Sequence, residues 1–205
     1  MAEIAGKLAA LYRQTTDAAI AFTTEATTED ATHLRYQITD DTKRYWDPNT
    51  AVHVYADAAE VTTGFTIEYP GGVIVFAVDP AAIITLTGAY LTMEEVGSLY
   101  NWSLDPQMDT LETTALGDSA KSFIAGLLGF TGSAEGYWID NSFYAALGDK
   151  LALALYVDTT SGSEKWYDCF ALITGDNIKV DEVDVVKETI PFQGTGGLYF
   201  RQNVA

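Results

Sequence analysis

The chain has 205 residues, of which 29 are acidic and 11 are basic, so its formal net charge at neutral pH is −18. Its hydrophobic share of 48% and aromatic share of 12% exclude a disordered acidic tail, which would be poor in both. Nucleic-acid binding depends on clustered basic residues, and here they are scattered singly apart from the pair Lys43-Arg44. The length predicts one large domain, or one domain with an appended module.

The N-terminal sequence does not resemble a secretory signal. Glu3 follows Met1-Ala2, and no apolar stretch of about 7–15 residues comes after it, so we expect a cytosolic origin. No apolar run approaches the roughly 20 residues of a membrane helix, and no membrane partner is expected. Because Cys169 is the single cysteine, no internal disulfide can form.

Short stretches rich in Val, Ile, Thr, Tyr and Phe, separated by Gly, Pro, Asp and Asn, predict an all-β protein. The expected strands cover residues 52–56, 61–69, 73–78, 83–91, 100–104, 108–116, 130–139, 151–157, 166–173 and 180–192. The Thr-rich residues 15–28 suit an extended arm or a loop. Apolar residues recur at spacings of three and four from Ala120 to Leu128, behind a possible N-cap at Ser119, which predicts one short helix.

The last long strand carries two irregularities. Its alternation slips at Val185-Val186, which predicts a β-bulge. Pro191 has no N–H to donate, so this end of the strand is expected at a sheet edge. The Gly-rich residues 193–197 that follow are interpreted as a turn or hinge.

No arrangement of residues indicates catalysis. His33 and His53 are the only histidines and are expected to face solvent, while Cys169 lies in an aromatic strand and is expected to be a buried thiol. Carboxylates adjacent in sequence, such as Glu94-Glu95, point to opposite faces of a strand, which is the wrong geometry for a shared acid/base site. We therefore expect no enzyme activity, no cofactor and no metal site.

Two stretches resemble tail tube proteins of tailed bacteriophages. Residues 108–127, MDTLETTALGDSAKSFIAGL, resemble a D-x-x-x-T-T-x-x-G-D strand end that precedes a short helix and then a strand like 132–138, GSAEGYW. Residues 190–196, IPFQGTG, resemble the aromatic-x-G-T-G ending of the long C-terminal strand in that family. Together they cover about half of the chain, and residues 45–91 look like a small β module that accompanies the tube proteins of long-tailed, siphophage-type phages.

The resemblance implies an all-β fold with one short helix and two packed β-sheets, as a sandwich or barrel. It also implies that the sheets join around a ring, usually of six subunits, and that rings stack into a tube in the virion tail after assembly in the host cytoplasm. The implied partners are further copies of the chain and the tape measure, tail terminator and tail tip proteins, with DNA passing through without specific binding. On this basis we expect an N-terminal arm and loop at 1–44, a small β module or insertion at 45–92, and a tube core at 93–205 that includes part of 1–44.

Acidic residues that face the channel would repel DNA in transit. The channel-lining candidates, chosen on strands that resemble the inner sheet, are Asp109, Glu112, Glu135, Asp184 and Glu188. The candidates for the intersubunit strand and loop are Ile190, Pro191, Phe192, Gln193, Gly194, Thr195 and Gly196.

One alternative from another class stays open. A monomeric β-sandwich could bind a carbohydrate or a cell-surface partner, with Tyr45, Trp46, Tyr137 and Trp138 as an aromatic platform. A hydrolase is a weaker alternative, because the sequence places no acid/base pair.

Overall fold

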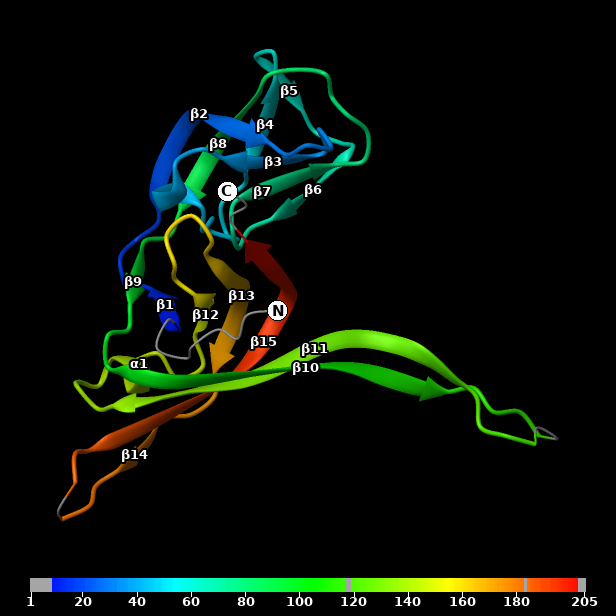
Figure 1. Cartoon of the computed structure of the whole chain (residues 1–205). Helices are drawn as coiled ribbons and strands as arrows, with labels where there is room; N and C mark the ends of the chain where they lie inside the picture. Colours follow the sequence, from blue (N-terminus) through cyan, green and yellow to red (C-terminus); the bar gives the residue numbers. More distant parts are fainter. Residues whose placement is uncertain (1–8, 117–118, 183, 203–205) are drawn as a thin grey trace. The chain divides into compact units, whose positions relative to one another are not determined.

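The structure is a computed structural model that describes residues 9–116, 119–182 and 184–202. Its regular structure is almost entirely β-strand, in two antiparallel sheets (Figure 1). Within the described residues there is one short α-helix, α1 (Ser142–Ala145), and no helix is long and apolar enough to span a membrane. The predicted all-β class with one short helix is therefore confirmed, although the helix lies elsewhere in the chain.

Close contacts divide the described chain into two compact units. Unit 1 comprises residues 9–97, 152–169 and 199–202. Unit 2 comprises residues 98–151 and 170–198, apart from the positions outside the description. Three long strands have residues in both units, so the chain crosses between the units within regular structure.

Unit 1 contains a seven-stranded sheet with the order β5-β4-β8-β2-β3-β7-β6. Its strands are β2 (Ile20–Glu29), β3 (Arg35–Ile38), β4 (His53–Ala56), β5 (Ala59–Val61), β6 (Phe65–Glu68), β7 (Val73–Phe76) and β8 (Ile84–Tyr90). The Thr-rich segment that we expected to be an arm or loop is β2, between β8 and β3. Threonine favours strands because its branched side chain suits a pleated surface.

The core of this sheet follows from alternation along its strands. In β8 the residues Ile84 and Leu86 are buried, while the alternating residues Thr85 and Thr87 are partly exposed. The side chains of this core with 0% exposure are Ile38, Trp46, Val54, Ile74 and Leu86. Residues 20–38 thus share a sheet and a core with the β module expected at 45–92.

The second sheet has eight strands in the order β10-β11-β15-β13-β12-β1-β9, with β14 paired to β15. Its strands are β1 (Ala10–Gln14), β9 (Met93–Glu95), β10 (Leu99–Glu112), β11 (Phe123–Tyr137), β12 (Lys150–Asp158), β13 (Lys165–Ile173), β14 (Asn177–Lys179) and β15 (Lys187–Gln202). In unit 1, β1 lies between β12 and β9. In unit 2, β11 lies between β10 and β15.

The predicted helix at 120–128 is wrong, because these residues belong mainly to β11, a strand of 15 residues. Apolar residues occupy both odd and even positions here, so no period of two is visible and the helical spacing arises by coincidence. Gly126 and Gly129 also weaken a helix. The strand is fixed by its pairing with β10, from Phe123 opposite Glu112 to Leu128 opposite Met108.

The C-terminal strand also differs from the prediction. It does not begin at Val180 or end before Gly194, but runs without a break through β15. Instead of an edge, it lies between β11 and β13. The carbonyl of Pro191 accepts a hydrogen bond from the Thr174 N–H (3.0 Å), just after β13 ends. Since the N–H and C=O of a strand residue point the same way, the missing N–H of Pro191 faces the end of β13 and breaks no ladder.

Gly194 is required by close packing within this strand. A Cβ at this position would lie 2.2 Å from Cζ of Phe130, which is itself only 2% exposed. The glycine therefore serves the contact between β15 and the Phe130 ring, and the predicted turn at this point is wrong.

Leu86 and Leu127 offer a matched pair for testing which surfaces are buried, since they are 0% and 82% exposed. We expect Leu86→Ala to lower the free energy of unfolding by about 2–5 kcal/mol, because it opens a cavity in the core. Leu127→Ala should change it by less than about 0.5 kcal/mol. Urea unfolding of the two monomeric variants measures both values, and equal losses would contradict the described core.

Candidate functional site

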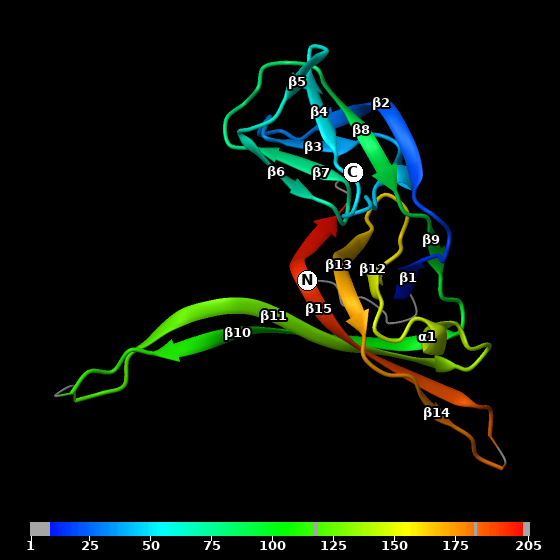
Figure 2. The ribbon, with the colours of Figure 1, turned by 180° about the vertical axis from the view of Figure 1, so that it is seen from behind.

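The long β10–β11 hairpin of unit 2 extends beyond the strand β15 that pairs with it. The two strands pair from Leu99 opposite Gly136 out to Glu112 opposite Phe123. In contrast, β11 pairs with β15 only between Thr131 and Tyr137. Beyond that point the hairpin is a two-stranded ribbon, and both views show no third strand beside it (Figures 1 and 2). Isolated two-stranded hairpins are only marginally stable in water, so this ribbon needs further contacts, such as a third strand, to be stable.

Large apolar side chains cover this ribbon and are exposed to solvent. They are Met108 (55%), Leu111 (57%), Phe123 (55%), Ile124 (54%), Leu127 (82%) and Leu128 (53%). We call these six residues the apolar ribbon. Single exposed apolar residues are ordinary, but six of them on one short ribbon, on both of its faces, indicate an interaction surface.

The channel-lining candidates on the hairpin are at or near its surface. Asp109 and Glu112 are exposed on β10, and Glu112 forms an ion pair with Lys121 across the ribbon (3.0 Å). Glu135 is half-buried on β11 and accepts a hydrogen bond from Asn101 Nδ2 (3.3 Å). These three carboxylates lie on one hairpin, which the sequence alone did not indicate.

The other two candidates lie in different surroundings. Asp184 precedes β15 in a loop, and its ion pair with Lys187 (2.6 Å) lowers the pKa of its carboxyl. Glu188 is on β15 but is only 4% exposed. Because this side chain is buried in the isolated chain, the prediction that Glu188 lines a channel has no support from its exposure.

The residues expected to form an intersubunit strand are used largely within this chain. Ile190 and Phe192 are 1% and 3% exposed, and they pair with Ala134 and Gly132 of β11. Gln193 donates a hydrogen bond from Nε2 to the Phe130 carbonyl (3.0 Å). The edge-strand interpretation of Ile190 to Gln193 is therefore wrong, and among the described strands β10 and β9 lie at the two ends of this sheet.

The aromatic platform of the alternative interpretation is not formed as expected. Trp46 has 0% exposure and belongs to the core of the seven-stranded sheet. Tyr137 and Trp138 are exposed in unit 2, with the Tyr137 ring 5.2 Å from that of Tyr100. Without Trp46, the platform loses one of the two indoles that would stack on a ligand.

The two histidines and the cysteine, which the sequence analysis considered for catalysis, lie where it predicted. His33 and His53 are exposed, as predicted, and each lies beside a glutamate, at 3.0 Å from Glu29 and 2.6 Å from Glu60. Cys169 is fully buried, as predicted, and burial raises the pKa of its thiol to about 12. Such a thiol stays protonated and unreactive near neutral pH.

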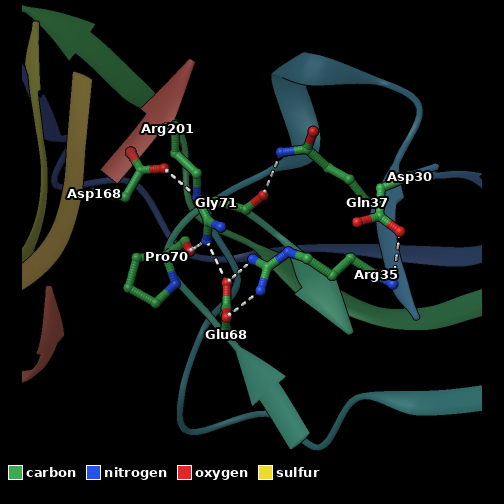
Figure 3. A network of polar contacts seen from close by, with 8 residues as sticks. All are labelled: Asp30, Arg35, Gln37, Glu68, Pro70, Gly71, Asp168 and Arg201. Carbon is green, nitrogen blue, oxygen red and sulfur yellow. Dashed lines mark hydrogen bonds and ion pairs between the residues drawn. The ribbon is translucent and has the colours of Figure 1, made fainter. Parts of the chain in front are cut away.

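A buried ion-pair network in unit 1 was not found from the sequence (Figure 3). Arg201, near the end of β15, contacts Glu68 through Nη2 (2.7 Å) and Asp168 through Nε (3.4 Å), and it also donates to the Pro70 carbonyl (3.0 Å). Arg35 binds the same Glu68 with both of its terminal nitrogens, at 3.1 and 2.7 Å. The network therefore links the end of β15 to the end of β6 and to the turn that follows it.

Asp168 is the most buried member of this network, with 0% exposure. Burial raises the pKa of its carboxyl, while hydrogen bonding from the Tyr45 hydroxyl (2.6 Å) and the charge of Arg201 oppose that rise. Burial and the negative charge of Asp168 raise the pKa of Tyr45 well above its ordinary value. Sequence inspection missed these contacts because Asp168 and Arg201 are 33 positions apart and match no motif.

No protein-family model and no curated protein matches this sequence. Among solved structures, a chain in the virion of a native gene transfer agent particle is similar over 53% of this chain and 88% of that chain, with 13% identity and a TM-score of 0.43. A chain in the tail of an empty gene transfer agent particle, with C6 symmetry, is similar over 54% and 87%, with 14% identity and a TM-score of 0.41.

Removing Arg201 tests the network. We expect Arg201→Leu to cost about 3–5 kcal/mol of unfolding free energy at pH 8, since it leaves the Asp168 carboxylate buried without its cation. The folded-state pKa of Asp168 is already raised and rises further in the variant, so its protonated, neutral form tolerates burial better. The loss should therefore shrink as the pH falls toward 5, measured by urea unfolding at both pH values.

Arg13→Leu is the control, because its partner Glu94 has a side chain that is 46% exposed. That variant should lose no more than about 1 kcal/mol at either pH. A loss in Arg201→Leu that does not change with pH would show that Asp168 does not depend on this arginine.

Proposed function

We propose that this chain is a structural, non-catalytic subunit of a phage tail tube, which assembles with copies of itself into stacked rings, usually of six. The observation that carries the proposal is the apolar ribbon at the end of a hairpin whose outer strand, β10, pairs with no other described strand on its far edge. An unpaired edge with apolar side chains promotes aggregation of a monomer, but in an assembly it can pair with the next copy. The motif resemblance of residues 108–127 falls on this same hairpin.

A neighbouring copy of the chain can supply both a strand for the open edge and a cover for the apolar side chains. It can pair with the open edge of β10, and it can cover the apolar side chains that water now contacts. Contacts of this kind, in which one surface meets a different surface of the next copy, close into rings or continue as filaments. The tape measure, tail terminator and tail tip proteins are the further partners proposed from the resemblance.

In such an assembly, the carboxylates of the hairpin become candidates for lining a channel. Asp109 and Glu112 are exposed and Glu135 is partly exposed, and with Asp184 they are the remaining members of the predicted set. A channel lined by carboxylates repels the phosphates of DNA and avoids the salt-like contacts that would hold DNA in place. The net charge of −18 per chain is in line with this role.

The ribbon can be tested with two variants that add the same charge at equally exposed apolar positions. Leu127→Asp changes the ribbon, and Val78→Asp changes a loop of unit 1 where the side chain is 76% exposed. Both monomers should keep their stability within about 0.5 kcal/mol. Only Leu127→Asp should abolish rings and tubes, as measured by sedimentation velocity and electron microscopy.

Tubes of normal diameter from Leu127→Asp would show that the ribbon is not the assembly surface. Loss of tubes in both variants would show that added charge, and not the ribbon, decides assembly. A wild-type chain that stays monomeric at every concentration would overturn the tail tube proposal itself.

The channel proposal makes a separate prediction for assembled tubes. Asp109→Lys with Glu112→Lys should make tubes retain DNA at low salt and shield it from nuclease, because the reversed charges attract phosphate inside the channel. The control Glu29→Lys with Glu60→Lys adds the same charge in unit 1, and DNA bound there should stay sensitive to nuclease. Retention should weaken as added salt shortens the Debye length from about 10 Å at 0.1 M. Nuclease-sensitive DNA on both tubes would place Asp109 and Glu112 outside the channel.

A further inference from the structure

A cavity in unit 1 is lined by charged groups of both signs and by aromatic side chains. It has a volume of about 310 Å³, and its walls come from three segments of the chain, at 41–45, at Tyr156 of β12 and at 164–168. This volume is at the lower end of the range for ligand pockets, so the cavity suits a small molecule or one unit of a larger one. The apolar ribbon belongs to unit 2, so the cavity is separate from the assembly surface proposed above.

The charges on the walls favour a ligand without net charge. The charged residues that line the cavity are Asp41, Arg44, Glu164 and Asp168. Asp168 is already paired with Arg201 (3.4 Å, Figure 3) and accepts a hydrogen bond from Tyr45 (2.6 Å). Apart from this pair the walls present two carboxylates and one guanidinium. A free cation is therefore repelled by Arg44, and a free anion is repelled by the carboxylates, whereas a neutral ligand avoids both repulsions.

The same groups call for a ligand that both donates and accepts hydrogen bonds. A guanidinium only donates, and an ionised carboxylate only accepts. Arg44 is partly exposed and forms no ion pair with another described residue, so its guanidinium can donate to a ligand. A hydroxyl group serves both kinds of wall group, because it donates one hydrogen and accepts through two lone pairs. Several hydroxyls on one neutral molecule would thus match these walls.

The rest of the wall is aromatic and uncharged. The rings of Tyr156 and Trp166 are stacked, with centroids 5.2 Å apart and planes at 15°. Burial raises the pKa of Tyr156 to about 12, and it also holds the pKa of Tyr45 well above its ordinary value, so both hydroxyls stay neutral. Aromatic side chains with polar tips suit a ligand that has apolar as well as polar surface.

The walls are held in place by packing and by backbone contacts. A Cβ on Gly72 would lie only 2.8 Å from the Arg44 carbonyl oxygen, so these two backbone segments are in close contact. The Trp46 N–H donates to the Tyr69 carbonyl (3.0 Å), which fixes the same segment two residues later. Trp166 is only 4% exposed and is held by its neighbours. A preformed wall lowers the entropy cost of binding.

We propose that this cavity binds a neutral sugar ring that is one unit of a glycan. A pyranose has hydroxyls around its rim and C–H groups on its faces, so it can bond with Arg44 and the carboxylates while it contacts the aromatic wall. Asp41 and Thr42 are exposed, so the cavity opens to solvent and can admit a sugar that stays attached to a chain. This binding function does not depend on self-assembly.

The binding test uses the methyl glycosides of glucose, galactose and mannose, whose blocked anomeric carbons mimic a unit within a glycan. At least one should give a saturable shift of the Trp166 indole N–H signal in nitrogen–proton NMR spectra of the full chain. Arg44→Gln should weaken this binding about tenfold, as expected for the loss of a hydrogen bond from a charged group. The control Arg13→Gln removes the same charge from β1 and should leave the affinity unchanged.

The absence of a saturable shift with all three glycosides would overturn the proposal. Equal affinities of the wild type and Arg44→Gln would also overturn it, because the cavity would then not be the binding site. Tighter binding of the three free sugars than of their glycosides would overturn the assignment to a glycan.

Salt separates a neutral ligand from an ion. Glycoside affinity should stay nearly constant as the salt rises from about 0.1 M to about 1 M, although the Debye length falls from about 10 Å to about 3 Å. Asp41→Asn should change the affinity only slightly, since an amide oxygen still accepts a hydrogen bond from a hydroxyl. Tighter binding of acetate, methylammonium or glycine than of the glycosides would overturn the proposal by assigning the cavity to a charged ligand. None of these outcomes bears on the ribbon, so the two proposals fail independently.

Discussion

The central constraint is the length of the β10–β11 hairpin. These two strands pair along almost their whole length, whereas β15 pairs with only the inner part of β11. Past Thr131 the described residues provide no third strand for the hairpin, yet it carries large, exposed apolar side chains. Shortening the hairpin or making it polar would be the simple solution for a monomer. Keeping it long and apolar is understandable if another chain completes the sheet.

Unit 1, in contrast to the ribbon, packs its apolar side chains into a fully buried core. The end of β15 in this unit is held by ion pairs. Arg201 joins Glu68 and Asp168, and Tyr45 completes the hydrogen bonding of that aspartate. These contacts hold the end of β15 in unit 1, while the middle of the same strand supports β11 in unit 2. The strand that carries the hairpin is therefore anchored at its far end by these ion pairs, next to a ring contact between Phe200 and Tyr167 (5.3 Å).

Much of the fold could be predicted from sequence, because alternation and turn residues mark strands directly, as at Ile84 and Leu86 in β8. The prediction failed where the alternation was absent. Residues 123–128 are apolar at both odd and even positions because both faces are exposed, and Pro191 indicated an edge although β13 ends opposite it. The polar network joins residues far apart in the chain, such as Asp168 and Arg201, so it had no local signal in the sequence.

The central claim is that the distal hairpin becomes buried when copies assemble. Amide hydrogen exchange, measured on monomers and on assembled protein, reports this burial for Met108–Glu112 of β10 and Phe123–Leu128 of β11. The account predicts fast exchange of these amides in the monomer and exchange slowed strongly in the assembly, while Leu86 in the core of unit 1 is protected in both. Equally fast exchange of the hairpin amides in both states would contradict the claim.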